Sequence, residues 1–265
     1  SERVGDGRSP IIFRLEGSLM RWVSIARTFV TAAAAAAVVA LTLPSLTGQT
    51  RAPGIPRLNG KPDLNGIWQA LNSANWDIQA HNAKAALAMR PGPVVPVPAK
   101  EVLAFGAVGS VPSGFGIVEG DEIPYTPDAL KKKIENQQNW LTRDPEIKCY
   151  LPGVPRANYM PFPFEIFQSG TAFFIAYEYA GAVRNVLLKD PGPAQVDSWM
   201  GQSVGRWDGD TFVIDVSGFN DQSWFDRAGN HHTEQLKVTE RYTMIDADHI
   251  QYEATMTDPQ TFTRP

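Results

Sequence analysis

Residues 164–256 alternate apolar and polar side chains, the pattern of β-strands that bury one face. Asp208-Gly209 lies between two such runs and is a strong signal for a two-residue hairpin turn. Asp246-Ala247-Asp248 separates a second pair of runs in the same way. The predicted strands cover residues 171–179, 183–188, 203–207, 211–216, 237–244 and 249–256. Short strands in hairpin order predict a mainly β fold, an antiparallel meander that forms a barrel or a sandwich.

Two accessory helices are expected ahead of this sheet. Residues 76–89 are rich in alanine and are followed by Pro91, which favours a helix that ends before the proline. Residues 127–141 form the second predicted helix, with Thr126 as its N-cap and Pro127 as its first helical residue. We therefore expect residues 63–265 to form a single β-rich domain with two helices.

The start of the chain has the parts of an export signal. A positively charged head over residues 20–28 precedes an apolar run over 29–43, and small residues then lead to Thr47. A membrane anchor is the alternative, but a run of about 15 residues is shorter than the roughly 20 that span a bilayer. We interpret residues 1–19 as translation from an upstream start, 20–47 as a signal peptide and 48–62 as a linker. The mature protein is expected to be periplasmic or secreted, without a stable membrane span.

The single cysteine, Cys149, is unusual for an exported chain, in which cysteines normally pair. The sequence stops directly after a strand-like run, so we expect a C-terminal truncation at Pro265. The partner of Cys149 would then belong to the missing segment or to another molecule. A single buried thiol is the alternative.

Composition narrows the class of protein. The chain has 265 residues, of which 43% are hydrophobic and 20% charged, with a formal net charge of −4. These values are typical of a folded globular protein and exclude a disordered one. An acidic chain also lacks the basic surface that binds phosphate backbones, so we expect no nucleic-acid partner.

One loop gathers candidate catalytic residues, namely Asp226, His231 and His232. A histidine beside a carboxylate is the usual general acid–base pair. In an extended segment His232 and Glu234 share a face, and imidazole with carboxylate suits a divalent metal such as zinc or iron. The spacing matches no standard zinc motif, and a solvated loop is the alternative.

Glu240 is the most unusual charged residue, because it shares the apolar face of its predicted strand with Val238 and Tyr242. A carboxylate on that face must be paired or must line a wet cavity. Arg184, which shares a face with Val186, is the predicted partner. The pair is either structural or orients a ligand.

Aromatic side chains are plentiful and supply flat surfaces for a ring or a sugar. Core packing is the alternative role of these side chains. Together with Glu240 and Arg184, the predicted ligand-binding residues are Trp68, Tyr177, Trp207, Trp224 and Tyr242.

Gly201-Gln202-Ser203-Val204-Gly205 matches the G-x-S-x-G pattern of serine hydrolases. That motif requires a strand-to-helix turn, whereas Ser203 precedes a predicted hairpin. We therefore interpret the two glycines as turn and strand residues.

Three stretches together resemble an uncharacterised family of exported bacterial β-rich proteins. They are Pro62-Asp63-Leu64-Asn65-Gly66-Ile67-Trp68, Pro161-Phe162-Pro163-Phe164-Glu165-Ile166 and the run from Trp199 to Thr211. The resemblance implies further strand and a second cysteine beyond Pro265. Gly66-Ile67-Trp68 is also similar to the Gly-x-Trp of lipocalins, where the tryptophan closes the barrel floor.

These observations predict an exported protein that binds a small organic, aromatic or carbohydrate ligand in an aromatic-lined β cavity. The first alternative is a hydrolase or lyase, with or without metal, that uses the loop of His231, His232 and Glu234. The second is a structural envelope protein. The patterns leave the oligomeric state open.

Overall fold

The computed structural model describes residues 54–84, 87–92, 99–104 and 110–265. Contacts within the chain separate Ser1–Ala52 from Pro53–Pro265, and all described residues belong to the second unit. The predicted upstream segment 1–19, the signal peptide 20–47 and the first part of the linker lie outside the described residues. Within the described part of the chain, no helix is both long and apolar enough to cross a membrane.

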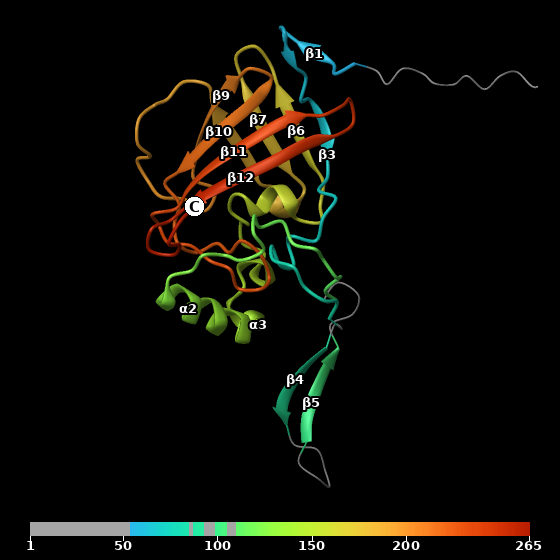
Figure 1. Ribbon diagram of the computed structural model, residues 1–265, viewed down its shortest axis with the longest axis vertical. Helices are drawn as coiled ribbons and strands as arrows, with labels where there is room; N and C mark the ends of the chain where they lie inside the picture. Colours follow the sequence, from blue (N-terminus) through green and yellow to red (C-terminus); the bar gives the residue numbers. More distant parts are fainter. Residues whose placement is uncertain (1–53, 85–86, 93–98, 105–109) are drawn as a thin grey trace, which may run out of the picture. The chain divides into compact units, whose positions relative to one another are not determined.

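The main element is a sheet of eight strands that curls into a half-barrel, as Figure 1 shows. Its spatial order follows the sequence from one edge to the other, which confirms the predicted meander. The two edges, β3 and β12, do not pair with each other. The strands are β3 (Gly66–Trp68), β6 (Phe164–Gln168), β7 (Phe173–Tyr177), β8 (Val183–Leu187), β9 (Gln202–Asp208), β10 (Thr211–Ser217), β11 (Lys237–Met244) and β12 (Ile250–Thr257).

One pair of strands departs from the expected antiparallel order. β8 and β9 run parallel, with Val186 opposite Ser203 and Leu187 opposite Val204. A parallel pair needs a long connection that returns the chain to the same end of the sheet, and residues 188–201 supply it. The prediction of a purely antiparallel sheet is therefore wrong at this position.

Two further two-stranded sheets lie outside the half-barrel sheet. β1 (Arg57–Leu58) and β2 (Lys61–Pro62) form a hairpin within the segment that we expected to be a linker. Arg57 forms an ion pair with Asp210, and the Lys61 ammonium donates to the carbonyl of Gly209 at 2.8 Å, so the hairpin contacts the β9–β10 turn. The other sheet pairs β4 (Leu87–Gly92) with β5 (Ala99–Ala104).

The predicted second helix is present as α2 (Pro127–Gln138) and the short α3 (Trp140–Arg143). The Thr126 hydroxyl accepts a hydrogen bond from the backbone N–H of Ala129, which confirms the predicted N-cap. The described residues also contain three 3₁₀ helices. They are η2 (Pro145–Lys148), η3 (Arg156–Tyr159) and η4 (Tyr179–Gly181).

The predicted helix over residues 76–89 is wrong. Turns occupy its first part, and isolated bridges join His81 to Gly114 and Lys84 to Val111. The backbone N–H of Ile78 donates to the buried Asp226 carboxylate at 2.9 Å, and the side chain of Asp77 accepts from the backbone N–H of Gln79. Carboxylates that accept backbone N–H groups compete with the helical ladder, and here they override the helix propensity of alanine.

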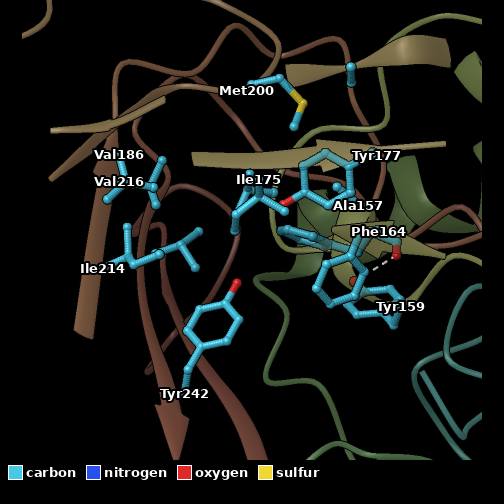
Figure 2. Close-up of a cluster of buried hydrophobic side chains, with 14 of the residues drawn as sticks. Ala157, Tyr159, Phe164, Ile175, Tyr177, Val186, Met200, Ile214, Val216 and Tyr242 are labelled. Carbon is cyan, nitrogen blue, oxygen red and sulfur yellow. Dashed lines mark hydrogen bonds between the residues drawn. The ribbon is translucent and has the colours of Figure 1, made fainter. Parts of the chain in front are cut away.

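The inner face of the half-barrel carries the hydrophobic core (Figure 2). Tyr177 from β7 and Tyr242 from β11 both reach into it, and the rings of Phe173 and Phe212 stack at 4.2 Å between centroids. Gly205 leaves the space that these rings need, because a Cβ there would lie 2.6 Å from Phe212 and 2.7 Å from Val186. The glycine is therefore a packing requirement of the core.

Candidate functional site

A cavity of about 750 Å³ opens between the two edges of the half-barrel. One wall is β12 from Ile250 to Met256, and the opposite wall is the end of β3 with the residues that follow it, Trp68 to Asn72. Residues 117–124 close a third side, and η3 contributes Asn158 and Tyr159. The volume is that of a typical small-molecule site. The cavity exists because the edge strands leave the barrel open.

Aromatic side chains cover much of the cavity wall. Tyr242 and Tyr252 are directly opposite each other on β11 and β12, with ring centroids 5.0 Å apart. Trp68 donates its indole N–H to the carbonyl of Leu64 at 2.9 Å, which holds the half-buried ring in place. The aromatic residues that line the cavity are Trp68, Tyr159, Phe164, Tyr242, Tyr252 and Phe262.

The Glu240 carboxylate lies behind these tyrosines and is fully buried. Both terminal nitrogens of Arg184 donate to it, one of them at 3.1 Å, which confirms the ion pair predicted from the strand pattern. The hydroxyl groups of Tyr252 and Tyr242 donate to Oε1 at 2.8 and 3.2 Å, and the Asn158 amide donates at 2.7 Å. The charge is therefore satisfied by the protein itself.

Burial and the charge of Glu240 shift the pKa values of the residues in this network. Burial by itself would lower the pKa of Arg184, but the charge of Glu240 raises that pKa well above its usual value. Burial and the same carboxylate raise the pKa of Tyr242 and of Tyr252 well above the usual range. Burial also raises the pKa of Tyr177 to about 12. The tyrosines stay protonated, so their hydroxyl groups act as donors to Glu240 across the physiological pH range.

A second buried network holds η3 in position under the cavity. The Arg156 guanidinium donates to Asn75 at 2.9 Å, to Asp144 at 3.2 Å and to Glu146 at 2.6 Å. Arg227 also binds the Glu146 carboxylate. Because Arg156 begins η3, these contacts fix the helix that carries Asn158 into the cavity.

His232, a predicted catalytic and metal-binding residue, is fully buried with both ring nitrogens paired. Its Nδ1 lies 2.9 Å from the carbonyl of Thr233, so this nitrogen carries the proton. Its Nε2 then accepts from the hydroxyl of Ser223, 2.7 Å away. Burial lowers the pKa of His232. Glu234 is exposed, so the expected pair of ligands does not form around His232.

His231 and Asp226 are also buried and belong to the same loop structure. His231 stacks on the ring of Tyr125, and burial lowers its pKa to about 4. The Asp226 carboxylate accepts the backbone N–H groups of Ile78 and Ala228, and burial raises its pKa to about 7. These contacts hold the loop in its folded conformation. No His231–Asp226 contact of the kind that general acid–base catalysis needs is present among them.

The predicted catalytic and metal-binding residues therefore lie away from the cavity. None of Asp226, His231, His232 and Glu234 lines it. Among residues 54–84, 87–92, 99–104 and 110–265, no three histidine, cysteine, aspartate or glutamate side chains are placed to hold a metal ion. An enzyme of the expected kind needs these groups in a concave site, whereas here Asp226 and His232 are buried and paired with other groups of the protein.

The predicted ligand-binding residues divide into three groups. Trp68 and Tyr242 line the cavity. Tyr177 lies behind it, where its hydroxyl donates to Asn158 at 2.8 Å, in the same network as Glu240 and Arg184. Trp207 packs on Phe212 beside the β1–β2 hairpin, and Trp224 is buried next to His231. These two tryptophans do not line the cavity.

The position of Ser203 excludes the nucleophile suggested by its sequence context, and the position of Cys149 decides between a buried and an exposed thiol. Ser203 is buried on β9 and accepts a hydrogen bond from Arg184 Nε at 2.7 Å, in the predicted hairpin and not at a nucleophile elbow. Cys149 is a free, exposed thiol in the left-handed region with φ 56°, so the alternative of a buried thiol is wrong.

Sequence reasoning missed Asn158 and Tyr252, which are central to the cavity. The register of the predicted β11–β12 hairpin places Tyr252 opposite Tyr242, and extending that register would have found it. Asn158 gives no periodic signal, since it lies in a single turn of 3₁₀ helix. Comparison of the chain with models of known protein families, with curated proteins and with solved structures found no match.

Proposed function

We propose that this chain binds a small organic ligand whose aromatic or sugar ring stacks on the aromatic wall of the cavity. The observation that carries the proposal is the composition of the cavity. Trp68, Tyr242 and Tyr252 line it, while the nearby charge of Glu240 is already neutralised by Arg184. A binding site needs shape, flat apolar surface and a few fixed polar groups, and this cavity has all three.

Two exposed apolar side chains at the mouth support an organic ligand. Leu71 is 88% exposed and Ile117 52% exposed, and both line the cavity. Neighbouring apolar side chains that face solvent around a hollow are typical of a ligand-binding surface. The enzyme alternative lacks such support, because its histidines are buried outside the cavity.

Export is part of this proposal. The charged head, apolar run and small residues between positions 20 and 47 support a signal peptide and a periplasmic or secreted location. The resemblance to exported bacterial proteins supports it independently of the cavity. Expression of the full chain in a bacterium, followed by mass spectrometry of the mature N-terminus, tests it. A mature protein that begins near residue 48 is the expected result.

The binding proposal is tested with four probes, namely 2-phenylethylamine, 2-phenylethanol, 3-phenylpropionate and methyl β-glucoside. Saturation-transfer NMR detects which of them bind, and titration calorimetry gives the dissociation constants. Trp68→Leu removes the stacking surface and should weaken binding about tenfold, corresponding to roughly 1.4 kcal/mol. Trp207→Leu is the matched control, because Trp207 lies outside the cavity. Failure of all four probes to bind, or equal losses in both variants, would contradict the proposal.

A further inference from the structure

The aromatic hydrogen-bond donors of the cavity wall are all used within the protein. Tyr242 and Tyr252 donate to Glu240, which as a carboxylate can only accept. Tyr159 donates its hydroxyl to the carbonyl of Phe225 at 2.8 Å, and Trp68 donates its indole N–H to Leu64. What these four side chains offer to a ligand is therefore ring faces and the lone pairs of phenol oxygens.

The Asn158 side chain also directs its amide donors toward other groups of the protein. Its amide nitrogen donates one hydrogen to Glu240 at 2.7 Å and the other to the Tyr252 oxygen at 3.0 Å. Its carbonyl oxygen accepts from Tyr177. The amide thus has no free donor, and the wall formed by Asn158, Tyr242 and Tyr252 presents acceptors only. Glu240 sets this direction for Tyr242, Tyr252 and Asn158, because its carboxylate, paired with Arg184, accepts from all three.

The rim of the cavity adds negative charge. Three exposed carboxylates lie among the residues that line it, Glu119 and Glu122 on the 117–124 side and Asp248 in the turn before β12. The basic side chains among the described lining residues are Arg264 and His249, and His249 already pairs with Asp246 at 2.8 Å. Exposed charges of one sign around a cleft raise the local concentration of ligands of the opposite sign.

We infer that the ligand is a cation, a protonated amine attached to a flat ring, and that the cavity discriminates against carboxylates and phosphates. The ammonium N–H groups match the lone pairs of Tyr242 and Tyr252 and the rim carboxylates. The faces of Trp68 and the two tyrosines attract a cation through their quadrupoles. An anion would meet the lone pairs of Tyr242 and Tyr252 and the carboxylates of the rim, with Arg264 as the one lysine or arginine among the described lining residues. This inference rests on the proposed function and specifies the chemical class of its ligand.

The test uses three probes that share one ring and differ in charge: 2-phenylethylamine, 2-phenylethanol and 3-phenylpropionate. Dissociation constants are measured by calorimetry at neutral pH in about 20 mM and about 300 mM NaCl. We expect the amine to bind at least tenfold more tightly than the carboxylate, with the alcohol between them. Salt should weaken binding of the amine and leave binding of the alcohol unchanged.

The double variant Glu122→Gln/Asp248→Asn removes one rim charge from each side of the cavity and should weaken amine binding two- to tenfold without affecting the alcohol. Glu234→Gln is the matched control, since Glu234 is exposed and lies outside the cavity. Binding of the carboxylate as tightly as the amine would overturn the inference and leave the proposed function standing. So would equal, salt-independent binding of amine and alcohol. Absence of binding by all three probes, and by methyl β-glucoside, would instead overturn the proposed function.

Discussion

Arg184 on β8 and Glu240 on β11 form an ion pair that spans two intervening strands, with side-chain exposures of 2% and 0%. The pair therefore ties together strands that are not neighbours in the sheet. Ser203 on β9 accepts from the Nε–H of the guanidinium, so each of its three nitrogens has a partner inside the half-barrel. The same carboxylate sets the direction of the tyrosine hydroxyl groups at the cavity, which links the stability of the sheet to the chemistry of the site.

Glu240→Gln is expected to destabilise the fold by about 3–5 kcal/mol, because it leaves the buried Arg184 charge without its partner. Urea denaturation followed by tryptophan fluorescence measures the loss. The double variant Arg184→Met/Glu240→Gln removes both charges but keeps an acceptor oxygen for Tyr242, Tyr252 and Asn158, and it should recover most of that stability. A double variant as unstable as Glu240→Gln alone would show that the charges themselves are not the cause.

Gly205→Ala should destabilise the protein by about 1–3 kcal/mol, because the added methyl group has no space in the core. It would lie 2.6 Å from the ring of Phe212 and 2.7 Å from Val186. Thermal or urea unfolding gives the difference. Gly54→Ala is the control, since a Cβ at Gly54 meets nothing within 4 Å, and it should be neutral. Equal effects of the two substitutions would contradict the packing argument.

His231 should make the protein less stable as the pH falls from 7 to 5. Burial lowers its pKa to about 4 in the folded state, so between about pH 6.5 and 4 the unfolded chain binds the extra proton. The stability associated with the neutral ring is complete above pH 6.5 and is lost below it. Relative to wild type, His231→Phe should therefore gain about 2 kcal/mol between pH 7 and pH 5.

This histidine effect has to be measured as a difference between proteins, because Asp226 acts in the opposite direction. Its pKa is raised to about 7, so its contribution to stability is present at low pH and lost as the pH rises through 7. Asp226 is present in both proteins and cancels in the comparison. Urea unfolding of both proteins at pH 7 and at pH 5 gives the result. A difference between wild type and His231→Phe that is the same at both pH values would contradict the prediction.

Cys149→Gly should be more stable than Cys149→Ala by about 1 kcal/mol. Cys149 ends η2 with φ 56°, a left-handed conformation that disfavours any residue with a Cβ and that glycine adopts freely. Comparing two small substitutions removes the effect of losing the thiol itself. Thermal unfolding measures the difference. An alanine variant equal to or more stable than the glycine variant would show that this backbone position is unstrained.

The strands from Phe164 onward could be predicted because alternation and turn chemistry are local. β11 is Lys237–Met244, as predicted, and the expected hairpin joins β9 to β10, although its two turn residues are Gly209-Asp210 because Asp208 still pairs with Thr211. The same alternation identified Glu240 as a carboxylate on a buried face and Arg184 as its partner. These features depend on the two-residue period of a β-strand, which is visible in the amino-acid sequence.

Tertiary contacts decided the conformation of segment 76–89, the environment of the histidines and the presence of the cavity. The alanine-rich segment 76–89 is not helical, because backbone N–H groups there donate to side chains such as Asp226, far away in the sequence. The histidines appeared reactive in sequence, but packing buries His231 and His232 outside the cavity. The sequence by itself determined the strands, their faces and a buried ion pair. Only the curl of the sheet, which keeps β3 and β12 apart, created the cavity, because its walls come from segments that no local pattern relates to one another.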